Sequence, residues 1–103
     1  MNSEDLLALL ASAGGFDWDE GNAKKNLTHG VEQFEIEQVF FNPPIVVLSD
    51  TQHSSNEGRW KLFGKTSAGR PLLVVFALRR KLIRPISARP MSKKETRFYE
   101  KEA

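Results

Sequence analysis

The sequence contains no cysteine, and this absence excludes disulfide bonds and thiolate metal sites. It is also compatible with a reducing cytoplasm. No apolar run approaches the roughly 20 residues that a membrane-spanning helix needs. The chain begins Met-Asn-Ser-Glu-Asp, which is acidic where a secretory signal is basic. We therefore expect a cytoplasmic protein.

Motifs for metal binding and for nucleophilic catalysis are also scarce. The chain has two histidines far apart and no acidic pair on an expected strand, so metal catalysis is poorly supported. Neither a glycine-rich phosphate loop nor a nucleophile elbow occurs. We expect no metal and no cofactor.

Charge is plentiful and unevenly distributed. The net charge over the 103 residues is +2. The composition, with 27% charged and 40% hydrophobic residues, is ordinary for one globular domain. Residues 1–57 hold two basic and ten acidic residues, a net of −8. Residues 58–103 hold thirteen basic and three acidic residues, a net of +10. The division indicates a basic face for a polyanion, provided that the fold does not mix the two halves.

Hydrophobic periodicity predicts helices in the first half of the chain. A leader helix within residues 1–15 is too short to be stable alone. A second helix follows Asp19 as its N-cap and ends near Gly30, a residue suited to a C-cap. A third runs from about Glu32 to Phe41, where two consecutive prolines follow.

The second half has the period of strands. We expect strands at Ile45–Leu48, Arg59–Lys65, Pro71–Leu78 and Leu82–Ala88. Because Pro85 cannot donate to a ladder, the last strand lies at an edge or carries a bulge there. A final helix runs from Lys93 to about Lys101. The order predicts a two-layer α+β fold with a meander antiparallel sheet of about four strands.

The last strand and the last helix meet at a corner rich in cations. Ser92 and Glu95 have the spacing of a capping box, which marks the helix N-terminus. The cations around it are Arg84, Arg89, Lys93, Lys94 and Arg97. A helix N-terminus adds positive potential, so phosphate is the natural ligand. The alternative is that these side chains are solvated and only keep the protein soluble, and composition does not decide between the two.

Short motifs stand in a fixed order along the chain. They are Phe16-Asp17-Trp18-Asp19, Asn26, His29-Gly30-Val31, Val39-Phe40, Asp50, His53-Ser54, Glu57, Arg59-Trp60, Gly64, Gly69-Arg70, Ile86-Ser87-Ala88-Arg89, Lys93, Glu95 and Tyr99. In this order they resemble the BrnT toxins of type II toxin–antitoxin pairs, which have a RelE-like ribonuclease fold. The resemblance runs from Phe16 to about Lys101. It implies a single toxin domain over residues 16–103, preceded by an extension of residues 1–15.

The resemblance implies RNA cleavage without metal, in which the 2′-hydroxyl attacks its own phosphate. This reaction needs cations at the phosphorane and groups that carry protons. The candidate catalytic residues are Arg84, Arg89, His53, Glu57, Lys94 and Tyr99. The candidate RNA-binding residues are Arg59, Lys61, Lys65, Arg79, Arg80, Lys93 and Arg97. Two alternatives stay open: His53 as a surface loop residue, and Tyr99 as a core aromatic of the last helix.

Strand alternation restricts where these cations point. It turns Arg59 and Lys61 outward from a half-buried strand. Arg84 and Arg89 are five positions apart, so they face opposite sides of a regular strand. A bulge at Pro85, or a strand that ends before Arg89, is needed to realign them.

The resemblance and the basic second half together predict an endoribonuclease toxin that inhibits translation. Its expected partners are RNA and a BrnA-like ribbon-helix-helix antitoxin, through which alone it contacts operator DNA. Thr28 and Thr96 replace basic residues of the family pattern, and Pro85 interrupts a strand. The alternative is therefore a catalytically weak or inactive homologue that acts as an antitoxin-binding co-repressor.

Overall fold

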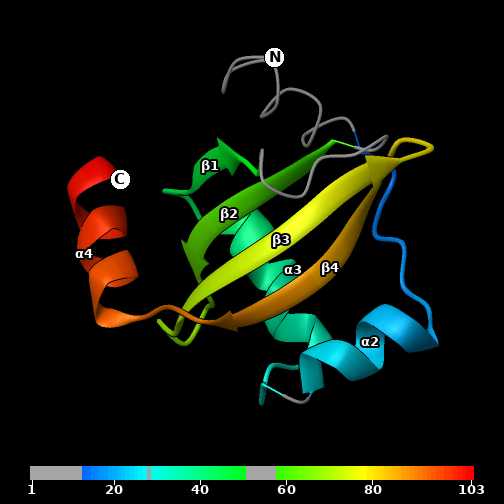
Figure 1. The fold of residues 1–103 in the computed structure, drawn as a ribbon, viewed down its shortest axis with the longest axis horizontal. Helices are drawn as coiled ribbons and strands as arrows, with labels where there is room; N and C mark the ends of the chain where they lie inside the picture. The colour runs from blue at the N-terminus through cyan, green and yellow to red at the C-terminus, as the bar shows by residue number, and fades with distance from the viewer. Residues whose placement is uncertain (1–12, 28, 51–57) are drawn as a thin grey trace.

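The computed structural model describes residues 13–27, 29–50 and 58–103, so most of the predicted leader helix lies outside these ranges. The elements are α2 (Glu20–Leu27), α3 (Gln33–Phe41), β1 (Val46–Ser49), β2 (Arg59–Lys65), β3 (Pro71–Arg79), β4 (Leu82–Pro90) and α4 (Lys93–Glu102). The strands form one antiparallel sheet in the order β1-β2-β3-β4 (Figure 1). The predicted α+β order is confirmed, with strand ends within two residues of those expected.

Helices α2 and α3 lie on one face of the sheet, and the main core forms beneath α3 (Figure 1). Alternate strand residues point into it, because successive side chains of a strand face opposite sides. Its largest fully buried members include Ile36, Leu62, Leu72, Val39, Val74 and Phe76. The Phe76 ring lies 5.1 Å from that of Phe40 and 5.9 Å from that of Trp60, between centroids. Burying each such side chain contributes about 1.5–3 kcal/mol, which fixes the register of the strands.

Helix α4 packs through its side chains against the opposite face. It lies beside one end of the sheet (Figure 1). Its Tyr99 and Phe98 contact Phe63 and Leu73, and the Phe63 and Phe98 ring centroids are 5.1 Å apart. The predicted capping box is confirmed: the Glu95 N–H donates to Ser92 Oγ at 3.1 Å, and the Ser92 N–H donates to Glu95 Oε1 at 2.8 Å. The helix therefore begins at a defined residue, close to the end of β4.

A bulge in β4 brings Arg84 and Arg89 to the same face of the sheet. Val75 pairs with Ser87 and Phe76 with Pro85, so the residue between them on β4 is extra. Arg84 then lies opposite Ala77 and Arg89 opposite Leu73, two β3 residues that are four apart. The predicted bulge is confirmed, and β4 is also an edge strand of the sheet.

Asn22 fastens α2 to the bulged strand. Its side-chain amide donates to the carbonyl oxygens of Asp17, at 3.0 Å, and Pro85, at 2.7 Å. Its Oδ1 accepts from the Asp19 N–H at 2.7 Å, and the Asn22 N–H donates to Asp19 Oδ1 at 3.0 Å, as the predicted N-cap requires. Since Asn22 is buried, these bonds satisfy groups that would otherwise be left without partners.

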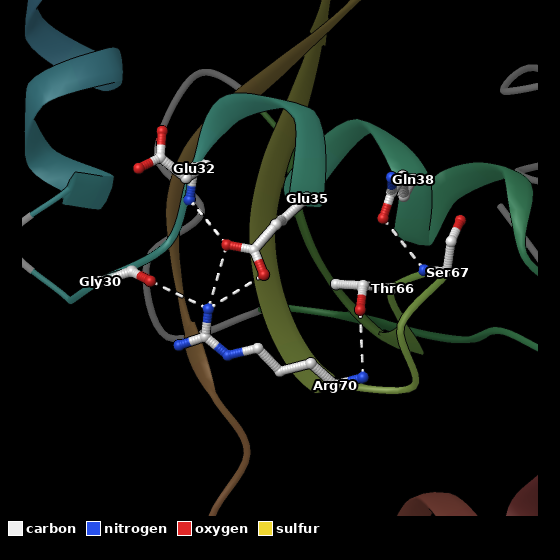
Figure 2. A network of polar contacts seen from close by, with 7 residues as sticks. All are labelled: Gly30, Glu32, Glu35, Gln38, Thr66, Ser67 and Arg70. Carbon is white, nitrogen blue, oxygen red and sulfur yellow. Dashed lines mark hydrogen bonds and ion pairs between the residues drawn. The ribbon is translucent and has the colours of Figure 1, made fainter.

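The β2–β3 hairpin is fastened to α3 by Arg70 (Figure 2). Its Nη1 donates to both Glu35 carboxylate oxygens, at 3.0 and 3.1 Å. Burial raises the pKa of Glu35, but hydrogen bonds from the Glu32 N–H and from Arg70 outweigh it, so the pKa lies below its ordinary value. A second bond runs from the Ser67 N–H to Gln38 Oε1 at 3.0 Å. These contacts hold the sheet against the helix without using the opposite face.

Candidate functional site

The face of the sheet opposite α3 carries three cross-strand rows of side chains. One row is Lys61, Val75 and Ser87, on β2, β3 and β4 in turn. The rows beside it are Arg59, Ala77 and Arg84, and Phe63, Leu73 and Arg89. Because adjacent strands lie about 4.8 Å apart, the β2 and β4 members of a row have backbones about 10 Å apart. Cations of both strands thus border a narrow apolar strip.

A groove of about 280 Å³ follows these rows, and we call it the basic groove. It is lined by Asp50, Arg59, Lys61, Leu73, Val75, Ile86, Ser87 and Arg89. The predicted outward orientation of Arg59 and Lys61 is confirmed, since both line it from β2. An apolar floor with cations on two sides suits a ligand that is both flat and anionic.

Arg59 and Lys61 are the unpaired cations of this groove. Neither side chain makes a hydrogen bond or an ion pair with any residue in the part of the chain that the structure describes. Both are half-buried, so their charges are less screened by water than those of fully exposed side chains. Their positive potential is therefore available to a bound anion.

Arg89 enters the groove already held by a carboxylate. Its Nη1 lies 2.7 Å from Glu95 Oε1, and its Nη2 lies 2.8 Å from Oε2. The bond from Arg89 and the Ser92 N–H outweigh the effect of burial and lower the pKa of Glu95 to about 2. A guanidinium has five N–H donors, so this pair leaves donors for a second anion.

Arg84 is fixed more firmly and does not line the groove. Its Nη2 donates to Asp19 Oδ2 at 2.8 Å, and its Nη1 lies 3.5 Å from Asp17 Oδ1. The Asn22 N–H and then Arg84 lower the pKa of Asp19. Only 17% of the Arg84 side chain is exposed. Arg84 ties the segment before α2 to β4, and its predicted catalytic role stays a prediction.

Tyr99 and Lys65 lie together beyond the groove. Tyr99 is 4% exposed, its hydroxyl donates to the Pro44 carbonyl oxygen, and burial raises its pKa. The Lys65 ammonium lies 5.9 Å from the centroid of its ring, within the range of a cation–π contact. The interpretation of Tyr99 as a core aromatic describes its surroundings, since it packs against Phe63 and Leu73.

The remaining predicted residues do not line the groove or are not described. The exposed cations on α4 and at the β3–β4 turn are Lys93, Lys94, Arg97, Arg79 and Arg80. The predicted proton carriers His53 and Glu57 fall within residues 51–57, outside the described ranges. Their roles stay predictions.

Asp50 lines the groove although no role was predicted for it. It follows β1, and its N–H donates to the Arg59 carbonyl oxygen at 2.9 Å. The residue is 2% exposed, and its Oδ2 has no hydrogen-bond partner among the described residues. Buried polar atoms are nearly always paired, so such an oxygen calls for an explanation. The only sequence signal for Asp50 was its place in the ordered motifs.

The described residues offer neither a metal-binding cluster nor a membrane-spanning helix. Within the described ranges, no three His, Asp or Glu side chains gather as a metal site would require. In the same ranges, no helix is long and apolar enough to cross a membrane.

Comparison with known proteins assigns the family. No curated protein matches the sequence. The family model described as ribonuclease toxin, BrnT, of type II toxin-antitoxin system matches residues 18–95. The matched segment contains every residue that lines the basic groove. Because it covers most of the chain, the protein belongs to the BrnT family, the ribonuclease toxins of type II toxin–antitoxin systems, as the ordered motifs predicted.

Proposed function

We propose that this BrnT toxin is an endoribonuclease that cleaves single-stranded RNA in the basic groove, without a metal ion, and thereby inhibits translation. The observation that carries this proposal is the gathering of Arg59, Lys61 and Arg89 around one apolar floor. Two of these three cations have no carboxylate partner among the described residues. A RelE-like relation, which the motifs imply, remains a prediction.

The groove fits single-stranded RNA better than a duplex. Unstacked nucleotides can place a base or ribose on an apolar surface, here Leu73, Val75 and Ile86, while the phosphate meets the cations beside it. Arginine suits the phosphate because its planar fork can donate two parallel hydrogen bonds. Cations fixed before the reaction also stabilise the extra charge on a phosphorane at little reorganisation cost.

The reaction consistent with this site is internal transesterification. The 2′-oxygen bonds to phosphorus, the bond from phosphorus to the 5′-oxygen breaks, and the products end in a 2′,3′-cyclic phosphate and a 5′-hydroxyl. Residues 51–57 join Asp50 to the start of β2, and Asp50 and Arg59 both line the groove. That connection supports keeping His53 and Glu57 as candidate proton carriers.

A type II toxin has an antitoxin partner, and we extend this to a BrnA-like ribbon-helix-helix protein acting in the cytoplasm. Acidic residues of its toxin-binding half would suit the basic groove, by steering association and by covering the phosphate site. Contact with operator DNA would then occur only through the antitoxin. A small adjacent reading frame of this kind is the expected genetic observation.

The test is cleavage of a 5′-labelled single-stranded RNA by the purified, folded protein in the presence of EDTA. We expect defined fragments that end in 2′,3′-cyclic phosphates, and arrest of growth when the chain is expressed without its antitoxin. Folded protein that leaves RNA intact, together with unaffected growth and bulk mRNA, would contradict the proposal.

A second function is favoured by the ion pairs of Arg84 and Arg89, which leave part of the positive charge neutralised. In that case the chain is a weak or inactive toxin homologue that binds the antitoxin and strengthens repression. Affinity and cleavage measured on the same RNA separate the two functions. Salt-dependent binding without any cut product would favour the co-repressor.

A further inference from the structure

We infer that the Asp50 carboxylate receives the 2′-hydroxyl of the nucleotide bound in the basic groove, first as hydrogen-bond acceptor and then as acceptor of its proton. This inference rests on the proposed ribonuclease function and assigns a residue within it.

The backbone places Asp50 on the groove side of the sheet. Leu48 pairs with Lys61, so both face away from the main core. Two residues further along the chain, just past the end of β1, the Asp50 N–H donates to the Arg59 carbonyl oxygen at 2.9 Å and continues the pairing with β2. With a side-chain period of two, Asp50 comes to the face that carries Lys61 and Arg59. Its position among the groove-lining residues agrees.

The Asp50 carboxylate has an unfilled hydrogen-bonding capacity. Its residue is 2% exposed, so little water reaches it. Its Oδ2 has no donor in the part of the chain that the structure describes, and no ion pair joins it to Arg59 or Lys61 there. A buried acceptor left unpaired costs free energy, and a ligand that brings a donor recovers it. Because Asp50 is one of the residues that line the groove, a ligand seated there is the one placed to bring this donor.

The chemistry of RNA supplies one donor at the required place. A carboxylate only accepts hydrogen bonds, so it repels the phosphate and leaves it to Arg59, Lys61 and Arg89. Next to a phosphate, the RNA backbone carries a 2′-hydroxyl, which can donate a hydrogen bond and which DNA lacks. An acceptor beside three cations is therefore matched to ribose next to phosphate. This arrangement selects RNA over DNA.

The same contact places a base at the nucleophile. The 2′-hydroxyl proton passes to Asp50 Oδ2 while the 2′-oxygen forms its bond to phosphorus. The bond from phosphorus to the 5′-oxygen breaks, and that oxygen takes a proton from a water molecule. The hydroxide left behind then removes the proton from Asp50, which restores the carboxylate. No oxidant, metal or further reactant is consumed.

The first test compares Asp50→Asn, which keeps the size of the side chain, with Glu20→Gln. The control removes the same charge from α2, where the Glu20 side chain is 89% exposed. In single-turnover cleavage, Asp50→Asn should lose roughly 10²- to 10⁴-fold, the range for a proton-transfer group. It should bind a DNA strand of the same sequence no more weakly than the wild type does. Glu20→Gln should match the wild type in both measurements.

The dependence of the rate on pH gives a readout that a merely structural role would not produce. The wild-type cleavage rate should rise with pH along an acid limb, and this limb should be absent in Asp50→Asn. Among described residues, the charged groups that face Asp50 are Arg59 and Lys61 of β2 and Arg89 of β4.

The second test isolates recognition of the sugar. By stopped-flow anisotropy, before cleavage, the wild type should bind RNA more tightly than DNA of the same sequence, and Asp50→Ala should lose this preference. Thermal unfolding establishes that each variant is folded. The inference is overturned if Asp50→Asn cleaves within threefold of wild type across the pH range, or if Asp50→Ala keeps the preference for RNA. If the wild type cuts no RNA, the proposed function fails by itself, and the RNA–DNA preference alone decides the role of Asp50.

Discussion

Four basic residues in the rows along the basic groove form two pairs, one on β4 and one on β2. Arg84 and Arg89, on β4, are each bonded to carboxylates. Arg59 and Lys61, on β2, have no such partner among the described residues. All four count equally in the net charge, but among the described residues no carboxylate neutralises the β2 pair, whereas both β4 arginines are paired. The amount of basic charge in a sequence therefore overstates the charge available for binding.

The physical cause of this difference is the position of helix N-termini. Each β4 arginine lies near the start of a helix, where a carboxylate is favoured by the helix dipole and by free N–H groups. Asp19 accepts from the Asn22 N–H at the start of α2, and Glu95 completes the capping box of α4. Once placed there, each carboxylate also binds the neighbouring arginine. Strand β2 lies between β1 and β3, away from both helix starts.

The largest expected effect comes from removing the two β2 cations that have no carboxylate partner among the described residues. Replacing Arg59 and Lys61 together by Ala should lower the cleavage rate by at least about 10²-fold. The variant loses two cations that contact phosphate and that stabilise the negative charge of the transition state. The plot of log affinity against log salt has a negative slope, and its magnitude should decrease by about 1.4, or 0.7 for each lost phosphate contact. Filter binding at several salt concentrations measures this slope.

The matched control for that variant is Lys24→Ala, since Lys24 is an exposed cation of α2. It should leave cleavage and the salt slope unchanged. An unchanged slope in the double variant would show that the β2 cations do not contact phosphate. The proposed difference between the cations of β2 and those of β4 would then be wrong.

Removing a bonded arginine should act mainly on stability. Arg84→Ala removes the cation that pairs with Asp17 and Asp19, so Tm should fall by about 2–5 °C. The salt slope for RNA should stay at the wild-type value. A clear fall in that slope with little change in Tm would instead support the predicted catalytic role of Arg84. Calorimetry and the binding assay above measure the two quantities.

Releasing the other arginine should have a smaller effect of opposite sign on binding. Glu95→Gln frees Arg89 for phosphate, so RNA affinity should rise about two- to fivefold, the equivalent of a weak ion pair. Weaker RNA binding by this variant would mean that Glu95 holds Arg89 in the geometry that binds RNA.

The stability that the Glu95 carboxylate contributes has a defined pH dependence. The folded-state pKa of Glu95, about 2, lies below its ordinary value of 4.5. Its contribution to stability is therefore complete above pH 4.5 and is lost as pH falls through 2. In urea unfolding, the wild type should be more stable than Glu95→Gln at pH 6, and the difference should disappear towards pH 2. A difference that persists at pH 2 would assign the effect to packing.

The smallest expected effect concerns the turn between β3 and β4. Arg80 and Lys81 occupy it with φ of +53° and +64°, a conformation that suits glycine. Lys81→Gly should raise the free energy of unfolding by at most about 1 kcal/mol, because the left-handed strain is relieved. RNA affinity should not change, since the basic groove lies elsewhere. A lower free energy of unfolding would show that Lys81 makes a stabilising contact there.

Much of the fold could be predicted because it depends on local signals. The periods of apolar residues placed the helices and strands, and Ser92 with Glu95 marked the start of α4. Alternation correctly turned Arg59 and Lys61 outward. The centre of the candidate site was expected at the β4–α4 corner, and that expectation stays a prediction. In the part of the chain that the structure describes, the groove-lining cations without a carboxylate partner lie on β2, facing Arg89 across β3.

The sequence by itself determined the order of the elements, the helix caps and the family, since each depends on residue type and short-range spacing. Only the tertiary structure decided which charges remain available. The ion pair of Arg84 with Asp19 joins residues 65 positions apart, and the bond from Asn22 to the Pro85 carbonyl spans 63. The bulge that aligns Arg84 with Arg89 depends on pairing with β3. Burial of the unpaired Asp50 oxygen likewise depends on its surroundings in the folded chain. Periodicity cannot supply these contacts, because burial and pairing are properties of the assembled sheet.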